Sequence, residues 1–377
     1  MRTIEMVDLK AQYEALAAEI DLAIKSVIDS TAFIKGPEVR LFESELGDYL
    51  GARHVISCAN GTDALQIAMM ALGLKPGDEV VTTNFTFIST VEVVALMGLK
   101  PVLTDPLEET FNISPDAVRK AVTNKTKAIV PVHLFGQCAD MEEIVKIATD
   151  NNLYVIEDAA QATGAEYSFS NGKKMKAGTI GHIGTTSFFP SKNLGCYGDG
   201  GAMYTNDDEL AMKLRSIANH GMKERYFYDD IGMNSRLDTI QAAILRVKLR
   251  YLDIFSSARM AVADFYDEAF MGCHDISVPG RSAFSTHIFH QYTIRIPAEA
   301  RKDLIDYLQE KKIPAMVYYP LPLHLQNAYR YLGHREGDFP VTGKLCRTVL
   351  SLPMYPELDQ EQLDYIASNI INFFEGR

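Results

Sequence analysis

The chain has 377 residues, of which 47% are hydrophobic and 23% are charged. This composition is typical of a folded globular protein, excludes a disordered or fibrous chain, and leaves room for a large unit with a smaller companion. A formal net charge of −12 repels polyanions, and the basic clusters at residues 173–176 and 223–225 are too small to form a nucleic-acid surface, so we expect no nucleic-acid partner.

The beginning of the sequence mixes charged with apolar residues and lacks the unbroken apolar run of a secretory signal. No apolar stretch of 18 residues follows, so we expect no membrane span and a cytoplasmic location. The odd number of cysteines and the lack of a C-x-x-C pair favour free buried thiols over a metal or redox site. The cysteines are Cys58, Cys138, Cys196, Cys273 and Cys346.

Between residues 50 and 205, short β-rich runs alternate with helical patterns, which is typical of an α/β fold with crossover helices and mostly parallel strands. The expected strands are residues 54–58, 79–83, 128–134, 153–157, 185–189 and 202–205. Apolar residues at positions 65, 68, 69 and 72 have helical spacing, so a helix is expected from about residue 62. Several strands are almost continuously apolar, which indicates that helices cover both faces of the sheet.

The second part of the chain begins with a long helical pattern at residues 236–270, which we expect to bridge two domains. A strand at residues 291–296 and helices at residues 300–311 and 360–374 follow. The sequence therefore predicts a large α/β domain, residues 1–250, and a small C-terminal α/β domain, residues 251–377.

Polar turns follow four of the expected strands, at residues 60–63, 84–87, 157–161 and 187–192. Because ligands of open α/β sheets bind beyond the carboxyl ends of the strands, these turns predict one cleft. Asn60-Gly61-Thr62 opens a helix whose free N–H groups can bind a phosphate, although ordinary capping explains the same residues. The chain has neither a Walker loop nor a Rossmann fingerprint at such a turn, which disfavours nucleotide hydrolysis and hydride transfer.

Two charged residues in these turns point to chemistry. Asp158 ends an apolar run. A carboxylate there either needs a cationic partner, such as a pyridinium N–H, or caps a following helix. Lys192 lies between a short apolar strand and a glycine-rich run. A lysine in such surroundings has a lowered pKa and is nucleophilic, whereas an isolated lysine is ordinarily a surface charge.

At these residues the sequence resembles the DegT/DnrJ/EryC1/StrS sugar-nucleotide aminotransferases, which are fold-type I enzymes dependent on pyridoxal 5'-phosphate (PLP). The resemblance covers nearly the whole chain and implies a large, mixed, mostly parallel sheet domain with a smaller C-terminal domain. Its markers are Asn-Gly-Thr-Asp-Ala-Leu from residue 60, Glu-Asp-Ala-Ala-Gln from residue 157, residues 187–192 with Gly-Asp-Gly-Gly from residue 198, and residues 234–243.

The resemblance also implies roles for single residues. Lys192 would be the Schiff-base lysine and proton shuttle, and Asp158 would pair with the pyridine nitrogen of PLP. The active sites would be shared in an obligate homodimer, because one cofactor contact comes from the neighbouring subunit. The other implied contacts are Gly61, Thr62 and Ser187 at the phosphate, Phe87 on the ring face, Gln161 at the O3' oxygen and Asn234 from the neighbouring subunit.

Residues 187–201, with residues 136–140 upstream, are most similar to family members that use L-glutamate to aminate C3 of a UDP-N-acetyl-3-keto-hexuronate, in surface polysaccharide biosynthesis. Arg236 offers a planar fork for the uronate carboxylate, but an ion pair with Asp238 at a helix start explains it equally well. Tyr318 and Tyr319 are expected at the substrate. Tyr318 stands where many members have histidine and cannot supply a cation near neutral pH, so the resemblance assigns the reaction type but leaves the sugar open.

Three other functions are compatible with this fold. An aminotransferase for a dTDP-3-keto-6-deoxyhexose would differ only in the sugar pocket. A PLP-dependent sugar dehydratase resembles these proteins but has histidine at the lysine position, so Lys192 disfavours it. A non-catalytic PLP-fold regulator is disfavoured by the complete set of Lys192, Asp158 and Gln161.

Overall fold

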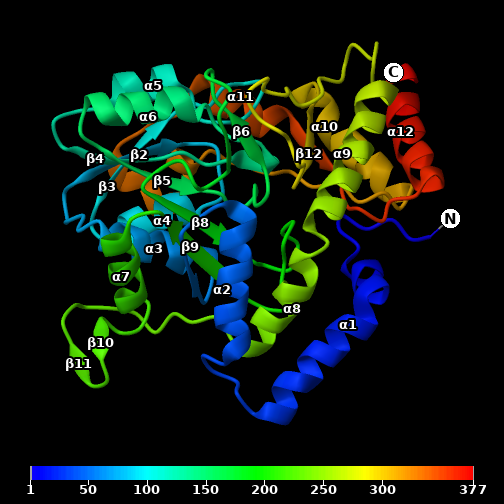
Figure 1. Cartoon of the computed structure of the whole chain (residues 1–377). Coiled ribbons are helices and arrows are strands. Elements are labelled where there is room, and N and C mark those ends of the chain that lie inside the picture. The colour runs from blue at the N-terminus through cyan, green and yellow to red at the C-terminus, as the bar shows by residue number, and fades with distance from the viewer. Residues whose placement is uncertain (1, 377) are drawn as a thin grey trace.

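A seven-stranded sheet forms the centre of the larger part of the protein (Figure 1). The computed structural model describes residues 2–376. In spatial order the strands are β1 (His54–Cys58), β9 (Gly201–Thr205), β8 (Ile183–Ser187), β5 (Tyr154–Asp158), β4 (Thr126–Val130), β2 (Glu79–Thr83) and β3 (Lys100–Thr104). Strand β9 runs antiparallel to both of its neighbours, and the other pairs are parallel. The expected α/β fold with a mixed, mostly parallel sheet is confirmed.

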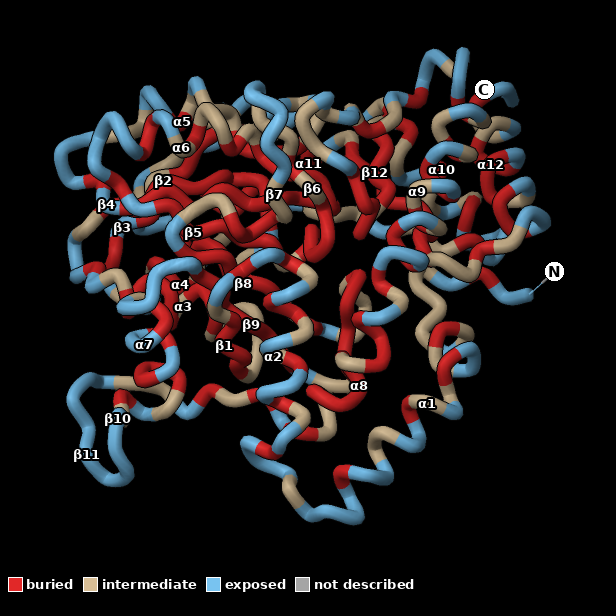
Figure 2. Tube along the Cα trace, in the orientation of Figure 1, coloured by how far each residue is buried: buried red, intermediate tan, exposed pale blue. Residues whose placement is uncertain are grey.

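Helices cover both faces of this sheet, and its strands are buried along most of their length (Figure 2). Because successive residues of a strand point to opposite faces, Val80 and Ile156 pack against one helical layer, whereas Val81 and Val155 pack against the other. The first layer contains α3 (Gly61–Ala71), α4 (Ser89–Leu96) and α7 (Asp208–Ile217). The second contains α5 (Pro115–Ala121), α6 (Met141–Asp150), α2 (Pro37–Leu50) and α8 (Thr239–Leu249).

The strands differ from the expected ranges in two informative places. Strand β4 ends at Val130, and residues 134–136 form a 3-10 turn with positive φ at Phe135 and Gly136, so the apolar run to residue 134 is not one strand. Strand β5 includes Asp158 as its last residue, so the carboxylate extends from the strand end itself.

The expected helix at residues 236–270 is two helices. Helix α8 ends at Leu249, and α9 (Leu252–Ala269) begins after Arg250 and Tyr251. Helix α8 packs against α2 and the N-terminal α1 (Leu9–Ser30), while α9 packs in the small unit. The N-terminal helices were not predicted.

The small unit has its own core, built around the antiparallel pair β12 (Tyr292–Arg295) and β13 (Val349–Leu352). Ile4 packs in this core and Arg2 pairs with Asp359, so the N-terminal segment lies against the C-terminal unit, as Figure 1 shows. Its helices are α9, α10 (Ala298–Glu310), α11 (Pro340–Thr348) and α12 (Gln360–Glu375), with 3-10 turns at Leu323–Leu325 and Asn327–Leu332.

Two short hairpins complete the fold. The first pairs β6 (Glu166–Ser168) with β7 (Lys174–Lys176), and the second pairs β10 (Met222–Glu224) with β11 (Phe227–Tyr228). All five cysteines are free, but Cys273 is only partly buried, because it lies in the loop after α9, so the expectation of buried thiols is wrong there. Among residues 2–376, no helix has both the length and the apolar character needed to cross a lipid bilayer.

Candidate active site

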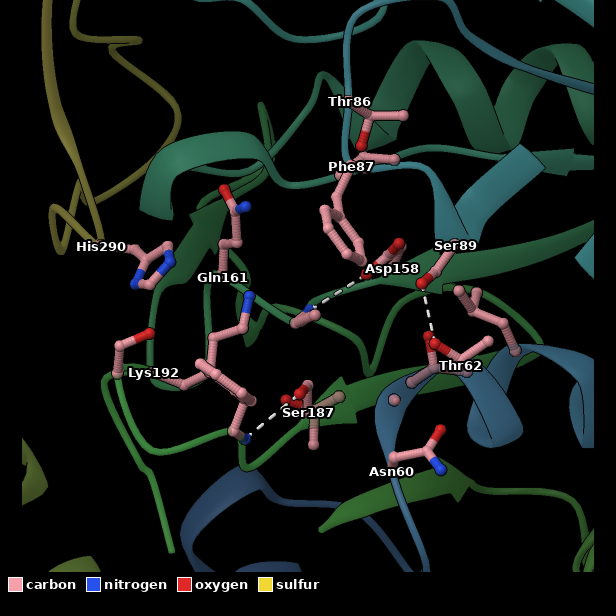
Figure 3. A pocket seen from close by; sticks show the side chains of 18 of the residues that line it. Asn60, Thr62, Thr86, Phe87, Ser89, Asp158, Gln161, Ser187, Lys192 and His290 are labelled. Carbon is pink, nitrogen blue, oxygen red and sulfur yellow. Dashed lines mark hydrogen bonds between the residues drawn. The ribbon is translucent and has the colours of Figure 1, made fainter. Parts of the chain in front are cut away.

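A cavity of about 810 Å³ lies where the chain leaves the carboxyl ends of β1, β2, β5 and β8 (Figure 3). The four polar turns therefore meet as expected for an open α/β sheet. The loop at residues 317–320 of the small unit supplies the opposite wall. Nine of the eleven residues singled out from the sequence line this cavity: Gly61, Thr62, Phe87, Asp158, Gln161, Ser187, Lys192, Tyr318 and Tyr319.

The start of α3 forms one end of the cavity. Asn60 caps the helix, because its Oδ1 accepts a hydrogen bond of 2.8 Å from the N–H of Asp63. The N–H groups of Gly61 and Thr62 precede any intrahelical partner and face the cavity end, where the helix dipole favours an anion. A Cβ on Gly61 would lie 2.7 Å from Cβ of Ser187, so glycine lets the helix start touch the end of β8. Capping and phosphate binding are thus compatible at the same turn.

Asp158 lies at the cavity floor, only 6% exposed. One carboxylate oxygen accepts a hydrogen bond of 2.8 Å from Thr90 Oγ1, and the other accepts one of 3.2 Å from the N–H of Ala160. The chain after Asp158 forms turns and no helix, so the alternative role of a helix cap does not apply. Thr90 and Ala160 hold the carboxyl group at the cavity, where its oxygens can accept a hydrogen bond from a ligand N–H.

The amine of Lys192 points from the opposite wall toward Asp158 and Gln161 (Figure 3). Its Nζ has no hydrogen-bond partner among residues 2–376. Burial lowers the pKa of Lys192 to about 8, and the charge of Asp158 opposes part of that decrease. Near neutral pH a much larger fraction of this amine is unprotonated than for an ordinary lysine, which makes it a nucleophile.

Gln161 links the two walls. Its Oε1 accepts a hydrogen bond of 2.7 Å from the N–H of Phe135, and its Nε2 donates one of 3.3 Å to Tyr319 Oη. The amide is therefore held in one orientation, and one N–H of Nε2 remains available to a ligand. Burial raises the pKa of Tyr318 and Tyr319, which keeps both phenols neutral hydrogen-bonding groups.

Sequence reasoning missed several residues of the cavity wall, among them Ser89 and His290, and the cation behind His290. His290 is 4% exposed, and burial and the positive charges of Lys192 and Arg259 hold its pKa well below the usual value. The buried Arg259 donates hydrogen bonds to the carbonyls of His290 (3.5 Å), Phe289 (3.2 Å) and Met354 (2.8 Å). A single arginine on α9 therefore holds three backbone carbonyls of the small unit behind the cavity wall, and no local motif indicates this.

Two predicted site residues lie outside the cavity. Asn234 is exposed in the segment before α8, and Arg236 lines a second hollow beside Lys35 and Arg215. Arg236 forms no ion pair with Asp238 or any other residue of the part of the chain described, so the helix-start alternative is not realised. Neither side chain serves the cavity of its own chain.

The residues present fit a flat phosphorylated ring such as PLP. The start of α3 and the hydroxyls of Thr62 and Ser187 lie at one end, where they could hold a phosphate, and we call this end the phosphate seat. A carboxylate and an amine face each other farther in. The amine can bind an aldehyde carbon covalently, and the carboxylate can hold a ring N–H. Phe87 is 54% exposed at the rim, where an aromatic ring can cover the ligand face.

Comparison with known proteins agrees with this geometry. Residues 14–371 match the model of the DegT/DnrJ/EryC1/StrS aminotransferase family. The sequence is 49% identical to the pleiotropic regulatory protein of Geobacillus stearothermophilus, covering 98% of both chains. It is 44% identical to the UDP-2-acetamido-2-deoxy-3-oxo-D-glucuronate aminotransferase of Pseudomonas aeruginosa, covering 98% of this chain and 100% of that protein.

Relatives that act on a different nucleotide sugar are also similar. The dTDP-3-amino-3,4,6-trideoxy-alpha-D-glucose transaminase of Streptomyces venezuelae is 40% identical, covering 95% of this chain and 93% of that protein. Among solved structures, DesV of S. venezuelae superimposes with a TM-score of 0.95 and 38% identity, covering 100% of this chain and 99% of that chain.

Proposed function

Because the chain belongs to the DegT/DnrJ/EryC1/StrS aminotransferase family, we propose that it moves an amino group from L-glutamate to C3 of a UDP-linked keto sugar. The chain is a PLP-dependent sugar-nucleotide aminotransferase. The preferred acceptor is UDP-2-acetamido-2-deoxy-3-keto-glucuronate, in surface polysaccharide biosynthesis. The observation that carries the proposal is the free amine of Lys192 facing the carboxylate of Asp158 across a cavity with a phosphate seat.

We propose the following roles for residues of the cavity. PLP, when bound, supplies an electron sink that stabilises negative charge on the substrate carbon. Asp158 would hold the ring N–H, Gln161 would bond the O3' oxygen, and Phe87 would cover the ring face. Lys192 Nζ would hold the cofactor between turnovers. Once free, it would take the proton from Cα of glutamate and, in the second half of the reaction, return a proton to the acceptor carbon.

We also propose that the working protein is a homodimer in which a second copy brings Asn234 to the cofactor phosphate and Arg236 to the acceptor. Both side chains lie outside the cavity of their own chain. Near them the β10–β11 hairpin projects from the large domain in Figure 1 with Tyr226 70% exposed and Phe227 68% exposed. Exposed aromatic residues beside site residues are typical of an interface.

The choice of sugar rests on the relative from P. aeruginosa and on Arg236, whose fork suits a carboxylate. A dTDP-3-keto-6-deoxyhexose is the second candidate, favoured by the relative from S. venezuelae and by Tyr318, which is a neutral residue at the sugar side. Regulation without catalysis, suggested by the name of the Geobacillus relative, does not account for an aligned lysine, carboxylate and phosphate seat.

The reaction is tested in two steps on the PLP-loaded protein. Addition of L-glutamate should convert bound PLP to pyridoxamine phosphate, seen as loss of visible absorbance, and Lys192→Ala should abolish the change. The pyridoxamine form is then mixed with the UDP-keto-uronate or the dTDP-keto-deoxyhexose. Faster recovery of the PLP absorbance with the first supports the proposed acceptor, and faster recovery with the second replaces it.

A further inference from the structure

A second hollow, of about 480 Å³, lies on the side of β1 next to the segment before α8. Its charged rim consists of Lys35, Arg40, Arg215 and Arg236, with Glu43 as the acidic residue of the lining. Four cations and one carboxylate give this surface an excess of positive charge. This excess stands out on a chain whose formal net charge is −12.

The internal hydrogen bonds leave most of this positive charge uncompensated. Glu43 pairs with Arg215 at 3.0 Å and also accepts hydrogen bonds from Ser57, so it neutralises one cation of the four. Lys35 donates to the neutral Asn219 Oδ1 at 2.7 Å. Arg40 and Arg236 make no hydrogen bond or ion pair with any residue that the structure describes.

The positive charges of the hollow repel one another, and this repulsion affects the pKa of Lys35. Burial lowers the pKa of Lys35, and the charges of Arg236 and Arg215 lower it further, while Glu43 acts in the opposite direction. Like charges held this close favour the binding of an anion between them.

The rest of the lining suits a nucleotide. The floor is apolar and buried, formed by Val39, Ile56 and Leu237, and the Ser57 hydroxyl lies beside it. An apolar floor of this size with a few convergent polar groups is typical of a small-molecule site. Guanidinium groups bind phosphate oxygens in a bidentate manner, so a ligand with an apolar plane and phosphates matches both parts.

The hollow is also rigidly connected to the active-site cavity. Ser235, between Asn234 and Arg236, donates a hydrogen bond of 2.6 Å to Asp63 Oδ2 and accepts one of 3.0 Å from the N–H of Ala59. Asp63 lines the active-site cavity. These bonds fix the position of Arg236 beside the turn that bears the phosphate seat.

We propose that this cationic hollow binds the diphosphate of the nucleotide sugar that accepts the amino group, with Lys35 and Arg40 as phosphate ligands beside Arg236. The proposal rests on the proposed function. In the proposed dimer, Arg236 of one copy contacts the acceptor bound by the second copy. Because Arg236 lines the hollow, the hollow of the first copy then faces that acceptor.

The test uses the PLP-loaded protein and UDP as the probe. Isothermal titration is carried out on the wild type, Lys35→Ala, Arg40→Ala and the double variant, with Arg53→Ala as the matched control, because Arg53 is an exposed arginine paired with Asp208 outside the hollow. Each hollow variant should weaken UDP binding by about tenfold or more, since hydrogen bonds to charged groups contribute roughly 1.5–3 kcal/mol. Arg53→Ala should leave the affinity for UDP unchanged. The hollow variants should bind uridine, which has no phosphate, as tightly as the wild type does.

Kinetics separate this inference from the proposed function. Conversion of PLP by L-glutamate should be unchanged in the double variant, whereas KM for the acceptor should rise with kcat kept. Failure of the glutamate step in the wild type would contradict the proposed function, not the hollow. Unchanged UDP affinity in the double variant overturns the inference, and so does a weaker UDP affinity with an unchanged acceptor KM, because UDP would then occupy an unrelated site.

Discussion

The proposed chemistry depends on one amine, that of Lys192, with which no other described residue forms a hydrogen bond or ion pair. Lys192 is held by its backbone, whose N–H donates to the Phe189 carbonyl at 2.8 Å, while Nζ extends freely into the cavity. A salt bridge would keep the amine protonated, and a hydrogen bond to it would restrict its movement. Burial without a partner instead leaves it both mobile and nucleophilic.

The pH dependence of cofactor capture should report this environment. Because burial lowers the pKa of Lys192 to about 8, the unprotonated fraction rises about tenfold per pH unit below that value and levels off above it. The rate at which the PLP-free protein binds PLP, followed by absorbance after rapid mixing, should have the same profile. An Nα-acetyl-lysine control should continue to rise toward pH 10.5. A protein profile that rises to the same pH contradicts the lowered pKa.

Substitution of Asp158 tests the carboxylate that faces the amine of Lys192. Asp158→Asn keeps the shape and one acceptor oxygen for the hydrogen bonds from Thr90 and Ala160, but it removes the negative charge that would stabilise a protonated ring. The rate of the glutamate step should fall by about 10²–10³, the usual range for removing one preorganised electrostatic group. Asp199→Asn is the matched control, because Asp199 lines the same cavity but is exposed. Equal losses in both variants would remove Asp158 from its proposed role.

At the residue scale, the sequence was informative where chemistry is local. Lys192, Asp158 and Gln161 stand within short turns after predicted strands, and the structure places them together. His290 and Arg259 were not predictable, because their positions depend on contacts between α9, the segment after residue 288 and Met354, which are far apart in the sequence.

The contact between α3 and β8 shows how two elements make the phosphate seat. An alanine at position 61 would place its Cβ 2.7 Å from Ser187 Cβ and 3.3 Å from Ser187 Cα, and the backbone must move to relieve the clash. Overpacking of this kind destabilises by about 1–3 kcal/mol. Gly61→Ala should therefore lower PLP affinity and Tm together, measured by titration and calorimetry.

Gly343 provides the control for this prediction. It lies within α11, and a Cβ there would meet only Arg347 Nη1 at 3.5 Å, an ordinary contact. Gly343→Ala should be neutral or slightly stabilising, because alanine favours a helix over glycine by about 1 kcal/mol. A Gly61→Ala protein with wild-type PLP affinity would show that the helix start does not bind the phosphate.

Strands were predictable where the apolar pattern is continuous along the whole strand. The expected ranges of β1 and β2 match the structure, but β3 was missed, because it is an edge strand that begins with exposed Lys100 and then Pro101, which interrupt the apolar pattern. The break between α8 and α9 at Arg250 and Tyr251 involves no glycine or proline, so the continuous helical period hides it.

At the scale of the molecule, the cavity requires both units. The large domain contributes the phosphate seat, Asp158 and Lys192, and the small unit contributes Tyr318 and Tyr319. Within the small unit, Arg259 binds the carbonyls of Phe289 and Met354 behind the cavity wall. Within one chain, however, Asn234 and Arg236 remain outside, which is the physical reason for proposing a second copy.

Mixed dimers test whether the sites are shared. Lys192→Ala should be inactive alone, and Asn234→Ala should bind PLP weakly, because it lacks one phosphate contact. Co-expressed with different affinity tags and purified as a hybrid, the two chains form one cavity that has both an intact lysine and an intact Asn234 from its partner. The hybrid should therefore recover about half of the wild-type activity, since one site of two is complete. If Asn234 served its own chain, neither cavity would be complete and the hybrid would show no recovery.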